Sequence, residues 1–133
     1  MSAFELACCQ ILDAIEPPTN EGAPIDRFAR VLDDYLRALA SDPAAARACL
    51  VEVYAAGPSA LERRRELQLQ LVESVAALTG ASGPADRFAV EALLAGLVQM
   101  ATARLAAGDA EGLRKLHEPT VELARRLRLG AHA

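Results

Sequence analysis

The side chains of this sequence that could carry out chemistry are few, and most of them stand alone. Glu52 is the one carboxylate in an apolar run, CLVEVYAA at residues 49–56. General acid–base catalysis requires a second acid or base within hydrogen-bond reach, and no spacing in the sequence supplies one. If Glu52 is buried, it must pair with a cation or with hydrogen-bond donors. An arginine of the following helix is the expected partner, and contact with a ligand is the alternative.

Three consecutive arginines, Arg63, Arg64 and Arg65, raise the question of a clamp for a phosphate group. Consecutive residues of a helix point about 100° apart, so the three side chains cannot all face one way. Glu62 and Glu66 flank them, and no further basic residues lie close by. We therefore expect most of these arginines to be solvated rather than to bind phosphate or DNA.

The thiols and imidazoles lack the spacing of a metal site or of a nucleophile with its base. Cys8 and Cys9 are adjacent, and Cys49 lies in the apolar run. Buried, unreactive thiols are expected, with redox sensing as the alternative. His117 and His132 match no metal-ligand spacing, so neither a metal nor another cofactor is expected. An enzyme is the weakest of the functional hypotheses.

Length and composition narrow the class of protein further. The chain has 133 residues, which favours a single domain over residues 1–133. Its net charge of −4 argues against direct nucleic-acid binding. The longest near-apolar run, at 92–103, is shorter than the roughly 20 residues of a membrane span. No basic segment precedes an apolar one at the N-terminus, so a cytoplasmic location with reduced thiols is expected. Abundant alanine and arginine suggest a GC-rich bacterial source.

Proline and glycine divide the sequence into six helices and no strands. The first is expected over residues 4–15, where Phe4, Cys8, Ile11, Leu12 and Ile15 follow helical spacing. Pro24 opens the second, which has the clearest amphipathic pattern. Its apolar stripe comprises Phe28, Val31, Leu32, Tyr35, Leu36 and Leu39.

The later helices begin at recognisable caps. Asp42 and Pro43 open the third helix, which is expected to run to Gly57. The fourth follows Pro58 to about residue 78, with Ser59 and Glu62 at capping-box spacing. The fifth is expected over 84–107 and the sixth from an Asp109 cap to about residue 129. Pro119 should kink the sixth or divide it.

The openings PIDRFA at 24–29 and PADRFA at 84–89 are interpreted as two similar helix starts, each with its Phe as the first core residue. An internal duplication is the alternative.

The last two helices have the features of a helix–helix seam. The fifth is apolar on nearly every side, which predicts burial on every side, and five other helices cover only one side of it. Gly96 in its middle costs about 1 kcal/mol relative to Ala, which a close approach of another backbone would explain. In the sixth, apolar residues and Thr120 recur at spacings of 3, 4, 3 and 4. A homodimer through these helices is expected, with an intramolecular seam as the alternative. Its contacts would be Leu94, Gly96, Val98, Leu105, Leu113, Leu116, Thr120, Leu123 and Leu127.

Two stretches carry a family resemblance. DPAAARACLVEVYAAGPSALERRREL at 42–67 and ARLAAGDAEGLRKLHEPTVELARRLRLG at 103–130 resemble the C-terminal domain of TetR-type (tetracycline-repressor-like) transcriptional regulators. With the helices between them, the resemblance covers nearly the whole chain. Its motifs are packing and capping patterns rather than catalytic signatures.

The resemblance implies an all-α six-helix bundle that holds a small effector and dimerises through its last two helices. In that family an N-terminal helix-turn-helix domain binds DNA, and this chain contains no such segment. It would therefore be an excised or truncated effector-sensing domain that does not bind DNA alone. The alternative is a stand-alone helical interaction protein that dimerises with other regulators.

A mostly apolar small-molecule cavity is the kind of site that remains. Gln99 and Thr102 stand out because they are polar on an otherwise apolar helix, although a place in the dimer seam or a hydrogen bond to the backbone would explain them equally well. The residues expected near the ligand are Tyr35, Tyr54, Gln68, Phe88, Gln99, Met100 and Thr102.

Overall fold

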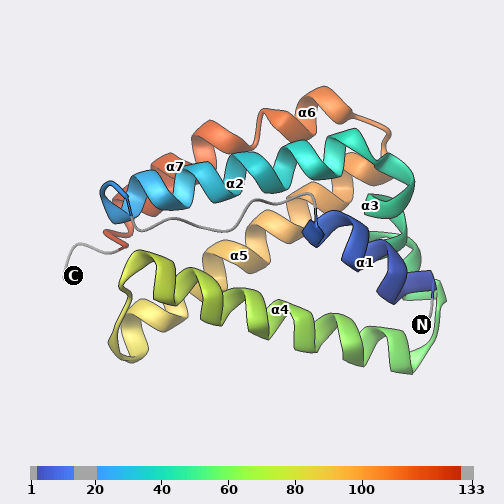
Figure 1. The fold of residues 1–133 in the computed structure, drawn as a ribbon, viewed down its shortest axis with the longest axis horizontal. Helices are drawn as coiled ribbons and strands as arrows, with labels where there is room; N and C mark the ends of the chain where they lie inside the picture. The colour runs from blue at the N-terminus through green and yellow to red at the C-terminus, as the bar shows by residue number, and fades with distance from the viewer. Residues whose placement is uncertain (1–2, 14–20, 130–133) are drawn as a thin grey trace.

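The computed structural model describes residues 3–13 and 21–129. Within these ranges all regular structure is helical, which confirms the all-α class (Figure 1). Seven α-helices and one 3₁₀ helix take the place of six expected helices, because the third and the sixth each divide. The elements are α1 (Ala3–Asp13), α2 (Pro24–Ser41), α3 (Pro43–Leu50), η1 (Glu52–Ala55), α4 (Pro58–Thr79), α5 (Gly83–Ala106), α6 (Ala110–Arg114) and α7 (His117–Arg126).

Two of the expected helix caps are confirmed, and one is wrong. The Asp42 carboxylate accepts from the Ala45 N–H at 3.2 Å, and that of Asp109 accepts from the Gly112 N–H at 2.8 Å. The capping box at the start of α4 does not form. Gly57 is the N-cap there, at φ +100° and with no side-chain hydrogen bond, so Ser59 falls inside the first turn.

The expected third helix ends early, and this decides the place of Glu52. Its α-helical part stops at Leu50, and the chain tightens into η1. In η1, Val53 is fully buried while Glu52 is exposed. The sequence-based expectation of a buried, paired Glu52 is therefore wrong, because the tighter turn directs the apolar neighbour inward and the carboxylate outward.

The expected sixth helix divides just before Pro119, as predicted. Because Pro119 lies in the first turn of α7, its missing N–H costs no helical hydrogen bond. The α6–α7 segment makes two polar contacts with α2. His117 Nε2 lies 2.9 Å from the Ala29 carbonyl oxygen, and Arg114 lies 3.8 Å from Asp33.

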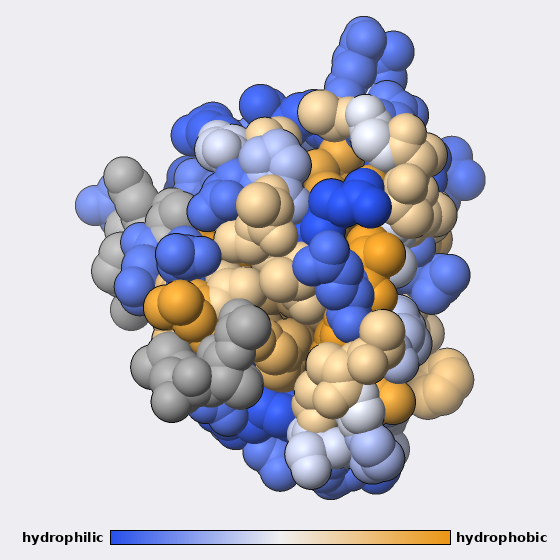
Figure 2. Space-filling model, turned by 90° about the vertical axis from the view of Figure 1, so that its right-hand side faces the viewer, coloured by the Kyte–Doolittle hydropathy of each residue, from blue (hydrophilic) through white to orange (hydrophobic). Residues whose placement is uncertain are grey.

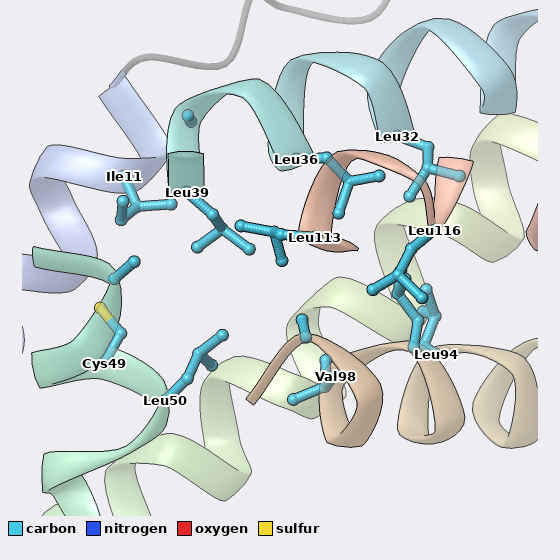
Figure 3. Close-up of a cluster of buried hydrophobic side chains, with 14 of the residues drawn as sticks. Ile11, Leu32, Leu36, Leu39, Cys49, Leu50, Leu94, Val98, Leu113 and Leu116 are labelled. Atoms are coloured by element: carbon cyan, nitrogen blue, oxygen red, sulfur yellow. The ribbon is translucent and has the colours of Figure 1, made fainter. Parts of the chain in front are cut away.

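The core lies where α2, α3, α5 and the α6–α7 segment meet (Figure 1). Figure 3 shows Leu36 and Leu39 of α2 facing Leu113, with Leu94 and Val98 of α5 on the opposite side. This arrangement corrects the expected dimer contacts, because most of them are needed inside the single chain. The buried ones are Leu94, Val98, Leu105, Leu113, Leu116 and Thr120.

Within the single chain, helix α5 is buried on one side only, which agrees with the expectation that the other helices cover one side of it. Its inner side packs in the core, but Phe88 is 72% exposed and Met100 41% exposed. From Ala92 to Ala103 the helix carries no charged side chain. By length and composition alone α5 is apolar enough to cross a bilayer, and 39% of its most apolar stretch is buried within the chain.

A candidate ligand cavity and a thiol pair

A cavity of about 330 Å³ lies among α1, α2, α3, α4 and α5. This volume is at the lower end of the roughly 300–1,000 Å³ typical of ligand pockets. Its walls are mostly apolar, and α1 and α2 contribute Phe4, Cys8, Ile11, Phe28, Val31, Leu32, Tyr35 and Leu39.

The inner face of α4 supplies one wall of the cavity. Its lining residues recur at helical spacing, and most of the others on that helix face solvent. Arg64 is the one charged residue among those that line the cavity. The α4 residues at this spacing are Arg64, Leu67, Gln68, Leu71 and Val75.

Arg64 lines the cavity, and none of the acidic side chains that the structure describes forms an ion pair with it. Its Nε atom is buried and has no hydrogen-bond acceptor within the described part of the chain. Its guanidinium lies over the ring of Tyr54, with Cζ 5.1 Å from the ring centroid. Leaving a buried N–H unsatisfied costs about 1–3 kcal/mol. By contrast, Arg63 on the adjacent position pairs with Glu66 at 2.9 Å.

Tyr35 lines the same cavity as Arg64 and carries a neutral hydroxyl. Burial raises the pKa of the Tyr35 phenol well above its usual range, so the group stays protonated at neutral pH. A protonated phenol both donates and accepts a hydrogen bond. The cavity therefore combines mostly apolar walls with one cationic residue and a few neutral polar ones, which are Tyr35, Gln68, Gln70 and Ser74.

Two thiols meet at another part of the cavity wall. The Cys49 thiol donates a hydrogen bond to Cys8 Sγ, with the sulfur atoms 3.0 Å apart. That bond, with the charges of Arg63 and Arg64, lowers the pKa of the Cys8 thiol despite its partial burial. The same hydrogen bond and burial raise the pKa of Cys49. Cys8 is half-buried, Cys49 is buried, and Cys9 is exposed.

The structure brings only two of the seven expected ligand residues to the cavity, Tyr35 and Gln68. Tyr54 is exposed and contacts Arg64 from outside the cavity lining. The Thr102 hydroxyl bonds the Val98 carbonyl of its own helix at 2.7 Å, as one alternative had foreseen. The remaining three lie on the exposed side of α5, away from the cavity: Phe88, Gln99 and Met100.

Sequence reasoning missed Arg64, Cys8 and Cys49 as cavity residues. For Arg64 a signal existed, because it shares a helical face with Leu67, Leu71 and Val75. Its position inside a run of three arginines concealed that signal.

The surface of α5 that remains exposed forms an outer apolar face. We define it by Phe88, Ala92, Ala95, Gly96, Gln99, Met100 and Ala103, of which Gly96 is half-exposed. Leu123 of α7, which packs against α5, and Leu127 at the C-cap of α7 are 44% and 39% exposed. Of the expected dimer contacts, Gly96, Leu123 and Leu127 thus remain accessible to a partner.

The end of the molecule where α1 and α3 lie has a more mixed surface than the outer apolar face of α5. Figure 2 shows apolar side chains interspersed there with hydrophilic ones rather than gathered in one broad patch. Around α3, Arg47 is directed inward and donates to the Leu105 carbonyl at 2.7 Å.

Arginine and glutamate pair elsewhere on the surface. Arg87 of α5 and Glu73 of α4 form an ion pair that lowers the pKa of the Glu73 carboxyl. Within the residues that the structure describes, no cluster of side chains has the composition of a metal site. Comparison with protein-family models, with curated proteins and with solved structures finds no match.

Proposed function

We propose that this chain is a ligand-sensing, self-associating domain of the kind found in TetR-type regulators. The observation that carries the proposal is Arg64, whose buried Nε lacks an acceptor at the wall of an otherwise apolar cavity. A structural arginine in a protein interior is normally paired. Arg64 forms no ion pair with the described residues, and it lines a mostly apolar cavity, so its charge can be balanced there by an anionic ligand.

The ligand that best fits these groups is a small apolar carboxylate. The apolar walls take up a hydrocarbon body, and the Arg64 guanidinium takes up the carboxylate, which it matches in shape and charge. The Tyr35 hydroxyl supplies a second donor. An apolar alcohol of the same size would gain the burial but not the charge-assisted hydrogen bond, worth about 1.5–3 kcal/mol.

We propose a second copy of this chain as the occupant of the outer apolar face. The face carries no charge from Ala92 to Ala103, and an added Cβ at Gly96 would meet no atom within 4 Å, so another helix has room to approach. A two-fold axis brings the same face of both copies together, and a face without charges does not repel its own copy. Leu123 and Leu127 would extend the contact onto α7.

Ligand binding would act through α1. This helix lines the cavity with Phe4, Cys8 and Ile11, and by the TetR resemblance it corresponds to the connector to a DNA-binding head. A ligand that fits one position of α1 better than another shifts the population toward that position.

The ligand proposal is tested with octanoate and octanol, which share an alkyl chain length and differ in the head group. Isothermal titration of the full chain should show tighter binding of octanoate. Arg64→Met should lose about 10- to 100-fold in octanoate affinity and leave octanol binding unchanged. Arg63→Met is the matched control, because Arg63 faces Glu66. Equal losses for both probes, or no octanoate binding by the native chain, would sink the carboxylate assignment.

The dimer proposal is tested by light scattering at low micromolar concentration. The native chain should have twice the 14.1 kDa monomer mass, and Ala95→Glu should halve the measured mass without loss of helical circular dichroism. Leu61→Glu, which charges an exposed apolar position on α4 instead, should remain dimeric. A monomeric native chain that binds lipid vesicles through α5 would contradict the proposal and assign the face to a membrane.

The same face supports one second candidate function. A related regulator with a similar uncharged helix could cover it in place of a second copy, which would make this chain a stand-alone dimerisation partner. A native chain that is monomeric alone and binds no vesicles would favour this candidate.

A further inference from the structure

We propose that Cys8 and Cys49 are a redox modification site, in which a hydroperoxide converts the two thiols into a reversible disulfide that joins α1 to α3. The inference is independent of the ligand proposal and of the family resemblance. It rests on the placement of two sulfur atoms from helices far apart in the sequence.

The geometry favours this one pair of thiols. Their sulfur atoms are 3.0 Å apart, and a disulfide bond is about 2.05 Å long, so they must approach by only about 1 Å. Among the helices that α1 packs against, α3 is the main partner, so the two backbones are already held together. Figure 3 shows Cys49 on α3 across from Ile11 of α1, in the layer of side chains between the two helices.

The two thiols also differ in burial and in how readily they form a thiolate. Cys8 is half-buried and lies at the cavity wall, where a small oxidant can reach it. The hydrogen bond from Cys49 and the nearby charges of Arg63 and Arg64 favour its thiolate form, which is the nucleophilic form. Cys49 remains a buried thiol and is placed to react second.

The disulfide forms in two steps. The Cys8 thiolate attacks an oxygen of the hydroperoxide ROOH; an S–O bond forms, the O–O bond breaks, and the leaving alkoxide or hydroxide takes a proton to become ROH. The Cys49 sulfur then attacks the sulfur of this sulfenic acid. The S–S bond forms, the S–O bond breaks, and the oxygen leaves as water with the proton of Cys49. Two thiols are oxidised by two electrons, and the hydroperoxide is reduced to ROH and water.

The product would fix one wall of the cavity. Both cysteines line it, and the new bond would prevent α1 from separating from α3 while it lasts. The position of α1 relative to α3 would thereby respond to oxidant.

The test treats the reduced full chain with hydrogen peroxide and then caps the remaining thiols with N-ethylmaleimide. Intact mass should show the number of labels fall from three, one for each cysteine, to one, and dithiothreitol should restore all three. Trypsin should release peptides 1–27 and 48–63 joined by a disulfide. Cys8 and Cys9 share the first peptide, so the Cys9→Ser variant assigns the bond and should still form it.

Two further variants keep the result decisive. Cys49→Ser should lose the cross-link, and Cys8→Ser should lose both the cross-link and the fast reaction with peroxide. Circular dichroism establishes that each variant is folded. Loss of the cross-link in Cys9→Ser, irreversible oxidation of Cys8 without a bond to Cys49, or three labels retained after peroxide would each overturn the proposal.

Discussion

The Arg64 guanidinium stacks on the ring of Tyr54, with 5.1 Å between Cζ and the ring centroid. Tyr54 itself is 54% exposed and does not line the cavity. The ring therefore contacts the guanidinium from outside the cavity lining, to which Arg64 itself belongs. A cation–π contact at an exposed site is worth about 0.5–1 kcal/mol.

Removing the Tyr54 ring should accordingly weaken binding of an apolar carboxylate, although the ring itself does not contact the ligand. We expect Tyr54→Leu to lower octanoate affinity by about 2- to 5-fold, measured by isothermal titration. Tyr54→Phe keeps the ring and should bind as the native chain does. If Tyr54→Phe loses as much affinity as Tyr54→Leu, the hydroxyl rather than the ring is what matters.

The hydrogen bond between Cys49 and Cys8 predicts an unusual pH profile for alkylation. A donor that favours the Cys8 thiolate lowers its pKa below the usual value of 9.0, so Cys8 should react with iodoacetamide at a lower pH than an ordinary thiol. Cys49→Ala removes the donor, so the pKa of Cys8 should rise and its alkylation at pH 7 should slow. Peptide mass spectrometry in a Cys9→Ser background follows Cys8 alone.

Cys49→Ser is the matched control for this pH profile. A serine hydroxyl still donates a hydrogen bond, so the low-pH reactivity of Cys8 should persist although no disulfide can form. Because the pKa of Cys8 is lower in the folded chain than in the unfolded chain, its thiolate adds to the free energy of unfolding at pH values above the unfolded pKa. This contribution is lost as the pH falls through the pKa of the folded chain. An identical profile in Cys49→Ala and Cys49→Ser would contradict the role assigned to the donor.

Several helix boundaries could be predicted from the sequence because their causes are local. Asp42 and Asp109 cap their helices through hydrogen bonds that span three residues, and Pro119 acts on its own turn. The orientation of α5 could not be predicted, because a helix that is apolar on every side carries no pattern to say which side faces the core. The openings PIDRFA and PADRFA show the consequence: Phe28 is 2% exposed, whereas Phe88 is 72% exposed.

The candidate site was harder to predict than the fold, for a related reason. Tyr35 was found because it belongs to the strongly amphipathic stripe of α2. The thiol pair was not, because it joins residues 41 positions apart, and only the packing of α1 on α3 brings them together. The dimer and the TetR-like role stay predictions, to be decided by the mass and ligand measurements above.

Gly96 offers a direct test of whether a second helix packs on the outer apolar face. In the single chain an added Cβ there would meet nothing within 4 Å, so Gly96→Ala should stabilise an isolated monomer by about 0.5–1 kcal/mol through helix propensity. In a closely packed dimer the same methyl group would keep the two backbones apart. We expect Gly96→Ala to weaken dimerisation in a light-scattering dilution series, and unchanged dimerisation would place the contact elsewhere on the face.

Asp109 and Gly112 should show a measurable coupling at the start of α6. The Asp109 carboxylate accepts from the Gly112 N–H, and a Cβ at Gly112 would come within 2.1 Å of its Oδ2 atom. Asp109→Ala should cost about 1 kcal/mol through the lost cap, and Gly112→Ala should also destabilise the fold because it displaces that carboxylate. In the Asp109→Ala background nothing remains to displace, so Gly112→Ala should instead stabilise by about 0.5–1 kcal/mol. Urea unfolding of the two single variants and the double variant measures this change of sign. Additive effects in that cycle would mean that the carboxylate does not hold the cap position that the structure gives it.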